Sequence, residues 1–470
     1  MTTRTTDTDT GTNTDTGTAE PLDLVGVGLG PFNLSTAALA DAVPGLATAF
    51  FDAKPRFAWH PGLLLDGTTL QVPFLADLVT LVDPTSRWSF LNYLREHDRL
   101  FPFYFTERFH VPRREYDAYC RWVAESLPSC RFGSRVVEVD ADERTGLFTV
   151  TVDGPDGRRT VHARNVVLGL GSEPSLPASL RPFAGRGVVS SAEYLSRRDA
   201  LLEARHVTVV GSGQSGAEVV LDLLQASRRP DGRVEGPALT WVTRTAAFAP
   251  MEYSKLGLEH FTPDYTRYFA GLPEATRRRL VGSQWQLYKA ASGETLGEVF
   301  DALYDRELAP EPAPPVILLP GTEVTSARPA AQGLELALRH AETALGVELA
   351  TDAVVAATGY RPVAPTLLDP LAERVLDGAG TVPVDGNARA VADLGIPGGL
   401  YVQNGDLAQH GVGTPDLGLS AHRSAVILND LRRRAGAPEP YRLPARTAFT
   451  TFGVPREGRI GAASDLGGVA

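Results

Sequence analysis

The chain has 470 residues, a formal net charge of -11, and ordinary fractions of hydrophobic (43%) and charged (21%) residues. This length is enough for two or three globular domains. The acidic balance disfavours nucleic acid and anionic membranes as partners. No apolar stretch reaches the ~18 residues of a membrane-spanning helix. The two cysteines, Cys120 and Cys130, suggest neither a disulfide framework nor a metal site. Residues 1–20 are rich in Thr, Asp and Gly and predict a disordered tail without a signal peptide, so a cytoplasmic location is expected.

The first predicted unit is a strand, a glycine-rich turn and a helix. The strand is 24–27, the turn contains Gly26, Gly28, Gly30 and Pro31, and the helix covers 32–42. Such a turn presents backbone N–H groups and a helix N-terminus to a pyrophosphate. Pro31 stands where the strict pattern has its last glycine, which weakens the motif taken alone.

A second strand, 47–51, follows this helix and ends at Asp52. An acidic residue about 20 residues after the turn is placed to accept hydrogen bonds from a ribose.

The same pattern returns in the middle of the chain. The strand 206–210 enters the turn Gly211-Ser212-Gly213-Gln214-Ser215-Gly216, and a helix over 217–227 and a strand over 239–243 follow. Arg244 ends this last strand, where Asp52 stands in the first unit. An acid repels a 2′-phosphate, whereas an arginine can bind it. Either turn alone could be a tight βα turn that binds nothing, but the pair predicts FAD at the first site and NADPH at the second.

The remaining segments complete an α/β plan. Helix-like stretches lie at 89–97 and 115–126, and strands of a small meander lie at 135–139, 148–152 and 161–168. A short strand over 399–403 leads into a helix over 417–433. The fold class is therefore α/β, with two Rossmann-like dinucleotide-binding domains and a mostly helical substrate-binding insertion. The expected parts are a disordered tail (1–20), a discontinuous FAD-binding domain (21–200 and 361–440), an NADPH-binding domain (201–245 and 311–360), a helical substrate-binding segment (246–310) and an irregular tail (441–470).

Hydrolase and metal chemistry are disfavoured by the motifs. The sequence has no P-loop, no zinc His-Glu-x-x-His motif and no nucleophile elbow. Ser215 lies within the second turn, where a hydroxyl suits a phosphate better than attack on a carbonyl. Trp59 and His60 follow the first unit and could either pack or flank a flavin. His410, in Gln409-His410-Gly411, could be a plain loop histidine or lie close to a flavin ring.

At this point the chain resembles the N-hydroxylating flavoprotein monooxygenases of siderophore biosynthesis. The matching blocks run in the same order from about residue 22 to 429. They are Gly26–Leu34, Trp59–Gly62, Leu70–Val79, Asp83–Ser86, Ser89–Leu94, Gly211–Gly216, Ala357–Tyr360 and Gln409–Gly411. The block from Gln71 to Tyr93 is not a general feature of flavoenzymes, so the resemblance is specific.

The resemblance implies that a terminal primary amine of an aliphatic chain becomes a hydroxylamine, with FAD, NADPH and O₂ and without a metal. NADPH would reduce the flavin, O₂ would add at C4a to give a hydroperoxide, and the neutral amine would attack its distal oxygen. A dimer or tetramer is expected. By analogy Gln71 lies against the flavin as the catalytic residue. The expected cofactor-binding residues are Gly26, Gly28, Gly30, Pro31, Asn33, Asp52, Trp59, His60, Gln71, Gly211, Gly213, Gln214, Ser215, Arg244, Thr358 and His410.

Position 76 bears on the choice of substrate. Family members that act on ornithine or lysine carry a lysine in the matching stretch, where it pairs with the substrate carboxylate. Here the stretch reads Phe74-Leu75-Ala76-Asp77-Leu78. A buried carboxylate without a cation costs several kcal/mol, so Ala76 favours a diamine such as cadaverine or putrescine. Leu258 and Leu287, which fall where ornithine enzymes place asparagines, point the same way.

Three other activities are compatible, to different degrees, with a fold that binds two dinucleotides. Hydroxylation of lysine or ornithine stays open if Lys255 or Lys289 supplies the cation. Baeyer–Villiger or sulfide oxidation is compatible with two dinucleotide turns, but the block 71–93 argues against it. A disulfide reductase needs a redox cysteine pair beside the flavin, and the two cysteines do not stand in such a motif.

Overall fold

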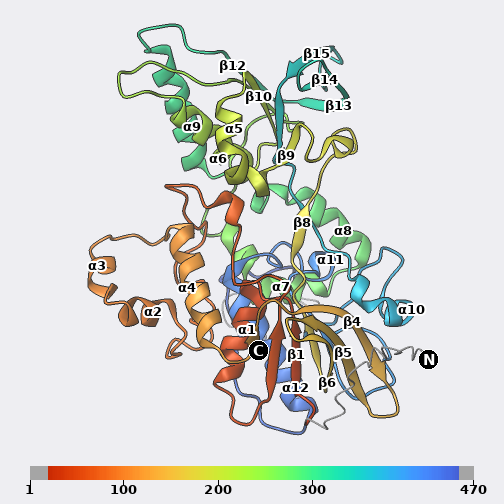
Figure 1. The fold of residues 1–470 in the computed structure, drawn as a ribbon. Coiled ribbons are helices and arrows are strands. Elements are labelled where there is room, and N and C mark those ends of the chain that lie inside the picture. Colours follow the sequence, from red (N-terminus) through yellow and green to blue (C-terminus); the bar gives the residue numbers. More distant parts are fainter. Residues whose placement is uncertain (1–19, 455–470) are drawn as a thin grey trace, which may run out of the picture.

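A five-stranded parallel sheet forms the centre of the first lobe, in the order β18-β7-β1-β2-β3. Figure 1 labels β1 in this lobe, next to the helix α1. The computed structural model describes residues 20–454, so the expected tail over 1–19 and the end of the chain over 455–470 lie outside the described range. All four residues of β1 are buried, as expected for a parallel sheet covered on both faces. The strands are β1 (Leu24–Val27), β2 (Thr48–Phe51), β3 (Cys130–Arg131), β7 (Val166–Leu168) and β18 (Leu400–Val402).

Three helices pack around this sheet. The helix α1 (Pro31–Asp41) contacts both α12 (Ser420–Arg434) and α4 (Arg113–Ser126). Ten of the eleven α1 residues are buried, because α1 lies between the sheet and these helices. Segments far apart in sequence therefore complete one core around the first glycine turn.

The second lobe repeats this plan around a parallel sheet in the order β12-β11-β10-β16-β9. Its strands are β9 (Val188–Ser190), β10 (His206–Val210), β11 (Ala238–Val242), β12 (Val316–Leu319) and β16 (Ala353–Ala356). The helix α6 (Gln214–Ala226) packs against α9 (Gly293–Glu307) and α5 (Tyr194–Leu202). The prediction of two Rossmann-like units is confirmed.

Three smaller sheets accompany the parallel ones, and all of them are antiparallel. The first lobe carries β4 (Arg135–Asp142), β5 (Leu147–Gly154) and β6 (Gly157–Ala163). The second lobe carries β13 (Thr322–Pro329), β14 (Leu334–His340) and β15 (Gly346–Thr351). The strands β8 (Ser172–Pro174) and β17 (Tyr360–Pro362) pair where the chain leaves the first lobe and where it returns (Figure 1).

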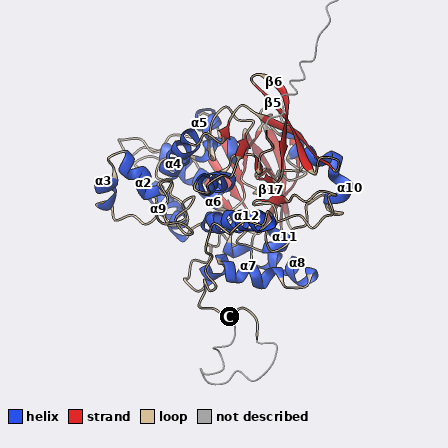
Figure 2. Ribbon diagram, turned by 90° about the horizontal axis from the view of Figure 1, so that it is seen from below, coloured by secondary structure: helices blue, strands red, loops and turns tan. Residues whose placement is uncertain are grey.

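The remaining elements are short or stand beside the sheets. The helices α7 and α8 both contact α11, and Figure 2 shows them grouped beside α12. The helices not yet given bounds are α2 (Phe90–Glu96), α3 (Leu100–Tyr104), α7 (Pro263–Ala270), α8 (Glu274–Ser283), α10 (Ala372–Val375) and α11 (Leu407–His410). The 3₁₀ turns are η1 (Pro61–Leu63), η2 (Arg181–Phe183), η3 (Ser191–Glu193), η4 (Gly257–Phe261), η5 (Trp285–Leu287), η6 (Thr366–Leu371) and η7 (Leu417–Leu419).

The predicted strand over 161–168 is wrong, because the chain forms two strands that belong to different sheets. The break falls at Asn165, whose side-chain amide donates to the Asp23 carbonyl at 2.9 Å and whose side-chain oxygen accepts from the Gly399 N–H at 2.9 Å. These bonds satisfy backbone groups where the ladder is interrupted. The second strand, β7, can therefore enter the first parallel sheet.

Three further differences concern where the lobes and one helix begin and end. The strand β9 falls within the range 21–200 expected for the first domain, yet it forms an edge of the second sheet. The helix α9 falls within the helical segment 246–310, yet Val299 on it packs into the core of the second lobe. Helix α6 begins at Gln214, three residues earlier than the predicted helix over 217–227.

The surface gives two further facts. Among residues 20–454, no helix combines the length and the apolar character that a membrane crossing requires.

Exposed aromatic side chains gather around α3, namely Phe101, Tyr104 and Phe105. Apolar patches of this kind are typical of contact surfaces. The dimer or tetramer expected from the sequence stays a prediction.

Candidate functional site

The first glycine turn is packed tightly at two positions and open at the third. A Cβ at Gly26 would overlap the Phe50 ring, and a Cβ at Gly28, where φ is +84°, would overlap the Gly169 carbonyl oxygen. At Gly30 an added Cβ would meet no described atom within 4 Å. Gly30 is the N-cap of α1 and provides no side-chain cap, so the first N–H groups of the helix remain available. This open helix N-terminus fits a pyrophosphate.

Asp52 stands at the carboxyl end of β2, directly beside the turn. Its Oδ2 accepts the Leu29 N–H at 2.7 Å, and its Oδ1 accepts the Lys54 N–H at 2.8 Å. These bonds fix the carboxylate at the edge of the sheet, where the sequence predicts a ribose partner. Each carboxylate oxygen can accept more than one hydrogen bond, so these contacts leave acceptor capacity for a ligand.

Asn33 supports the turn from beneath, which differs from the predicted contact with the cofactor. Its side-chain amide donates to the carbonyl oxygens of Gly28 at 2.8 Å and Val27 at 3.1 Å, and the residue is fully buried. Pro31, the first residue of α1, has a fixed φ and no N–H to leave unsatisfied, so it suits this position.

The second turn repeats the arrangement in the other lobe. A Cβ at Gly211, where φ is +115°, would overlap the Ala357 carbonyl oxygen, and one at Gly216 would overlap the Gly211 carbonyl oxygen. Gly213 caps α6 without a side chain, and Ser215 lies half-buried in the first turn of that helix. The second helix N-terminus therefore also lacks a side-chain cap, but it is less open than the first, because a Cβ at Gly213 would lie 3.0 Å from the Lys289 carbonyl oxygen.

Arg244 follows β11 directly and is exposed. Within residues 20–454 it forms no ion pair with an acidic side chain. Beside it, the hydroxyl of Ser212 lies 2.9 Å from that of Thr243 and 3.1 Å from that of Thr245. Hydroxyls and a free guanidinium at the carboxyl ends of parallel strands suit a phosphate.

The predicted catalytic residue Gln71 reaches across to the second turn. Its amide Nε2 donates to Gln214 Oε1 at 2.9 Å. The Gln214 amide in turn donates to Glu218 Oε1 at 2.8 Å and to Thr295 Oγ1 at 2.9 Å. The two expected dinucleotide sites are thus joined by a direct side-chain hydrogen bond.

A buried ion pair strengthens the same junction. Arg113 at the start of α4 donates from both terminal nitrogens to the two carboxylate oxygens of Glu218 on α6, each at 2.7 Å. The side chains are 12% and 4% exposed. Sequence reasoning missed this pair, because an arginine at the start of a helix gives no sign of burial.

Trp59 packs against the core of the first lobe, and its backbone N–H is held in place. A position beside a flavin stays a prediction. The Trp59 N–H donates to Asp117 Oδ1 at 2.7 Å. The Trp59 ring packs edge-on against His60 at 4.9 Å and Tyr116 at 5.1 Å between centroids. The Trp-His pair therefore forms part of an aromatic cluster.

His60 is held in a left-handed conformation, with φ of +47°, and faces Tyr360 at 6.1 Å between ring centroids. Part of the residue is exposed. The loss of hydration around its imidazole, followed by the positive charges of Arg113 and Lys54, lowers the pKa of His60 to about 4. The ring is therefore neutral at pH 7.

Two predicted cofactor residues, His410 and Thr358, already have protein partners. His410 is 3% exposed; its Nε2 donates to the Asp385 carbonyl oxygen at 3.0 Å and its Nδ1 contacts Asp406. Its imidazole is therefore turned into the protein, and the approach of this loop to a flavin stays a prediction. Thr358 Oγ1 donates to the Ser175 carbonyl oxygen at 2.6 Å, so it joins the two strands that cross between the lobes.

Asp406, His410 and Arg423 form a buried ion-pair cluster, called here the Asp406 cluster. Burial by itself would raise the pKa of Asp406, but the charges of Arg423 and His410 outweigh it and hold that pKa well below its usual range. Arg423 Nη1 donates to Asp406 Oδ1 at 2.6 Å. These groups satisfy one another inside the first lobe.

Ala76 is buried and lies beside the loop that joins α11 to α12. A Cβ at Gly418 in this loop would lie 4.0 Å from the Ala76 Cβ. At the other end of the loop, a Cβ at Gly413 would lie 3.7 Å from the His260 carbonyl oxygen of η4. The loop therefore runs between Ala76 and the helical segment.

The other predicted substrate residues lie on that helical segment. Leu258 in η4 is 38% exposed. Leu287 in η5 packs against the buried cluster of Tyr265, Phe269 and Val412. Lys255 is exposed, and Lys289 Nζ lies 5.0 Å from the centre of the Tyr288 ring. The described contacts place none of these four residues against Ala76.

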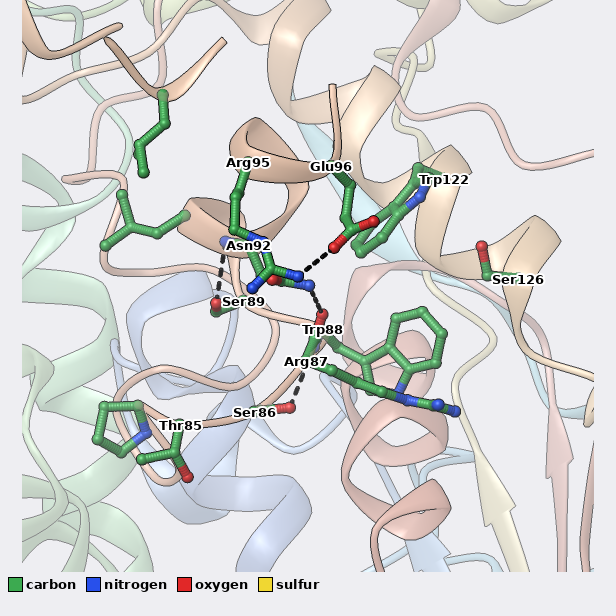
Figure 3. A pocket seen from close by; sticks show the side chains of 13 residues that line it. Thr85, Ser86, Arg87, Trp88, Ser89, Asn92, Arg95, Glu96, Trp122 and Ser126 are labelled. Carbon is green, nitrogen blue, oxygen red and sulfur yellow. Dashed lines mark hydrogen bonds and ion pairs between the residues drawn. The ribbon is translucent and has the colours of Figure 1, made fainter. Parts of the chain in front are cut away.

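A surface pocket of about 700 Å³ lies between residues 84–89, α2 and the end of α4 (Figure 3). Its lining holds the Arg95–Glu96 ion pair and a hydrogen bond from Asn92 to the Arg87 carbonyl oxygen. None of its lining residues belongs to either glycine turn. In the described range, no three His, Cys, Asp or Glu side chains form a group that could hold a metal ion.

Comparison with known proteins agrees with this geometry. Residues 20–362 match the family model described as L-lysine 6-monooxygenase/L-ornithine 5-monooxygenase. The rhizobactin siderophore biosynthesis protein RhbE of Rhizobium meliloti is 45% identical over 439 residues, which is 92% of this chain and 95% of that protein. A putrescine N-hydroxylase of Shewanella oneidensis is 38% identical over 92% of this chain and 84% of that protein.

A solved structure extends the similarity to the whole fold. DfoA of Erwinia amylovora, a cadaverine monooxygenase of desferrioxamine biosynthesis bound to FAD, superposes with a TM-score of 0.87. The match has 36% identity and covers 94% of this chain and 100% of DfoA. The chain therefore belongs to the L-lysine 6-monooxygenase/L-ornithine 5-monooxygenase family of flavin N-monooxygenases.

Proposed function

We propose that this protein hydroxylates one terminal amine of an aliphatic diamine, cadaverine or putrescine, for hydroxamate siderophore synthesis. The observation that carries the proposal is Ala76, a buried residue where enzymes of this family that act on amino acids carry a lysine. The similarity to a putrescine N-hydroxylase and to a cadaverine monooxygenase supports the same substrate class.

The two glycine turns fit FAD and NADPH. The open space at Gly30 and the carboxylate of Asp52 suit the FAD pyrophosphate and ribose, and the α6 N-terminus with Arg244 suits NADPH and its 2′-phosphate. When bound, the two cofactors supply the electrons and the oxygen transfer that convert an amine into a hydroxylamine with O₂.

The chain itself has to position the amine and keep it uncharged at the reacting end. An aliphatic ammonium has a pKa of about 10.4, so the reacting amine must lose its proton before it can act as a nucleophile. The Gln71–Gln214 hydrogen bond joins the two segments that we expect to hold the cofactors.

Lysine or ornithine hydroxylation is the second candidate, and the description of the family model favours it. It requires a cation for the substrate carboxylate. Lys255 and Lys289 are the candidates on the helical segment, and both are exposed. Either one would have to approach the buried position of Ala76.

The test is hydroxylamine product from the FAD-loaded protein with NADPH and O₂. Cadaverine, putrescine, L-lysine and L-ornithine are compared at equal concentration. NADPH consumption is not sufficient, because uncoupled turnover releases peroxide. Product from the diamines alone supports the proposal, whereas product mainly from lysine or ornithine contradicts it.

Ala76→Lys is expected to leave diamine turnover no better and to raise L-lysine turnover about tenfold relative to cadaverine. The reason is that a cation at this buried position offers the substrate carboxylate a partner worth more than ~1 kcal/mol. Leu75→Lys is the control, because it adds the same charge at the preceding, partly exposed position. An unchanged ratio of lysine to cadaverine product in Ala76→Lys would refute the argument from position 76.

Arg244→Ala is expected to raise KM for NADPH about 10- to 100-fold and to leave KM for NADH unchanged. Loss of a charge-assisted contact to the 2′-phosphate costs about 1.5–3 kcal/mol. Initial rates with each nucleotide measure the effect. Arg233→Ala removes another exposed arginine of the same lobe as the control. An equal rise for both nucleotides would exclude Arg244 from the 2′-phosphate site.

A further inference from the structure

A carboxylate beside Ala76 has no positive partner within the protein. Asp416 caps η7, and its Oδ1 accepts the Gly418 N–H at 2.7 Å. The residue is half-buried. Its other oxygen, Oδ2, forms no hydrogen bond or ion pair with any residue of 20–454, and it is not among the fully enclosed polar atoms. The free oxygen is therefore still open to a ligand.

Three other carboxylates buried in this part of the protein are compensated. Asp406 pairs with Arg423, and Glu218 pairs with Arg113. Asp77 accepts backbone N–H groups from Val79, Thr80 and Phe90, as well as the Thr80 hydroxyl. The Asp416 carboxylate accepts only one hydrogen bond within residues 20–454, from the Gly418 N–H. Burial raises the pKa of Asp416 to about 6, so it is mostly ionised at pH 7 and lacks a counter-ion.

The position of Asp416 connects it to the substrate region. Asp416 belongs to the loop whose Gly418 approaches Ala76 on one side, and the same loop meets η4 on the other. Burial first, and then the negative charge of Asp416, raise the pKa of Tyr253 to about 12. The carboxylate therefore belongs to the loop that contacts Ala76 and the segment expected to hold the substrate.

We propose that Asp416 binds the ammonium group at the far end of the diamine, the end that is not hydroxylated. This inference rests on the proposed function. A diamine keeps one positive charge when its reacting amine is neutral, since the pKa of an aliphatic ammonium is about 10.4. An ammonium has three donors and no acceptor, which matches a carboxylate oxygen without a donor.

The same contact would act as a specificity device. Lysine and ornithine also carry an ammonium at this end, but on the same carbon as a carboxylate, which would meet Asp416 with like charge, and Ala76 offers no cation to offset it. A diamine brings a positive charge to the same place and pays no such penalty. Asp416 and Ala76 together would therefore favour a diamine over an amino acid.

Asp416→Asn tests the proposal, because asparagine keeps the helix-capping acceptor and removes the charge. In the FAD-loaded protein we expect KM for cadaverine to rise about 10- to 100-fold, with kcat at saturation and KM for pentylamine unchanged. A calorimetric titration of cadaverine into the same protein without NADPH should show the same loss of affinity. Asp393→Asn is the matched control, because Asp393 caps Gly395 in the same way at an exposed turn.

Each result bears on one claim. Equal KM changes for cadaverine and pentylamine, or an unchanged cadaverine affinity, would overturn the role of Asp416 while diamine product from the wild type still supports the proposed function. Wild-type product from lysine alone would overturn the proposed function. In that case the calorimetric titration decides separately, because cadaverine binding that Asp416→Asn weakens would still support an ammonium contact at Asp416.

Discussion

Gly28→Ala is expected to yield protein without bound FAD and with a markedly lower melting temperature. Gly28 has φ of +84°, a conformation that costs an alanine about 1–2 kcal/mol by itself. An added Cβ would also overlap the Gly169 carbonyl oxygen, which is backbone and cannot rotate away. The ends of β1 and β7 would have to separate, and the turn before α1 would lose its shape. Flavin absorbance per protein and a thermal melt measure both effects.

Gly211→Ala is the informative companion, because the same clash occurs in the other lobe. A Cβ there would overlap the Ala357 carbonyl oxygen, at φ of +115°. We expect this variant to retain FAD and to lose NADPH-dependent reduction of the flavin. Gly297→Ala on α9 is the control, since its Cβ would meet nothing within 4 Å and alanine favours a helix. FAD content in Gly28→Ala equal to that of Gly297→Ala would contradict the assignment of the first turn.

The fold could be predicted from the sequence where local patterns determine it. Each glycine turn follows a buried apolar strand and begins a helix that has no side-chain cap, and this combination is visible in Gly26–Pro31 and Gly211–Gly216. The end of a parallel strand also has a fixed place at the sheet edge. Asp52 and Arg244 therefore stand where the sequence expected them.

Side-chain direction could not be predicted in the same way. Asn33 and His410 belong to matching motifs, yet the Asn33 side-chain amide N–H and the His410 Nε2 each bind a carbonyl oxygen inside the protein, because buried donors must be satisfied. A motif fixes which residue type occurs and leaves open which neighbour it contacts. Contacts between distant segments, such as Gln71–Gln214 and the loop of Asp416 beside Ala76, depend on the packing of the whole chain.

Arg113→Met is expected to lower the free energy of unfolding by about 3–5 kcal/mol, because it leaves the buried Glu218 carboxylate without its partner. The loss should also slow flavin reduction by NADPH, since Glu218 accepts the hydrogen bond that orients Gln214 towards Gln71. Urea unfolding followed by tryptophan fluorescence, together with stopped-flow reduction of the flavin, measures the two effects.

The exposed pair Arg228–Asp305 provides the matched control. Its side chains are 58% and 47% exposed, so Arg228→Met should cost no more than about 1 kcal/mol. The double variant Arg113→Met with Glu218→Met should recover most of the stability, because no unpaired charge is left in the junction. It should not recover the rate of flavin reduction, because methionine cannot accept the Gln214 hydrogen bond. If Arg113→Met cost no more than Arg228→Met, the two lobes would not be joined by this ion pair in solution.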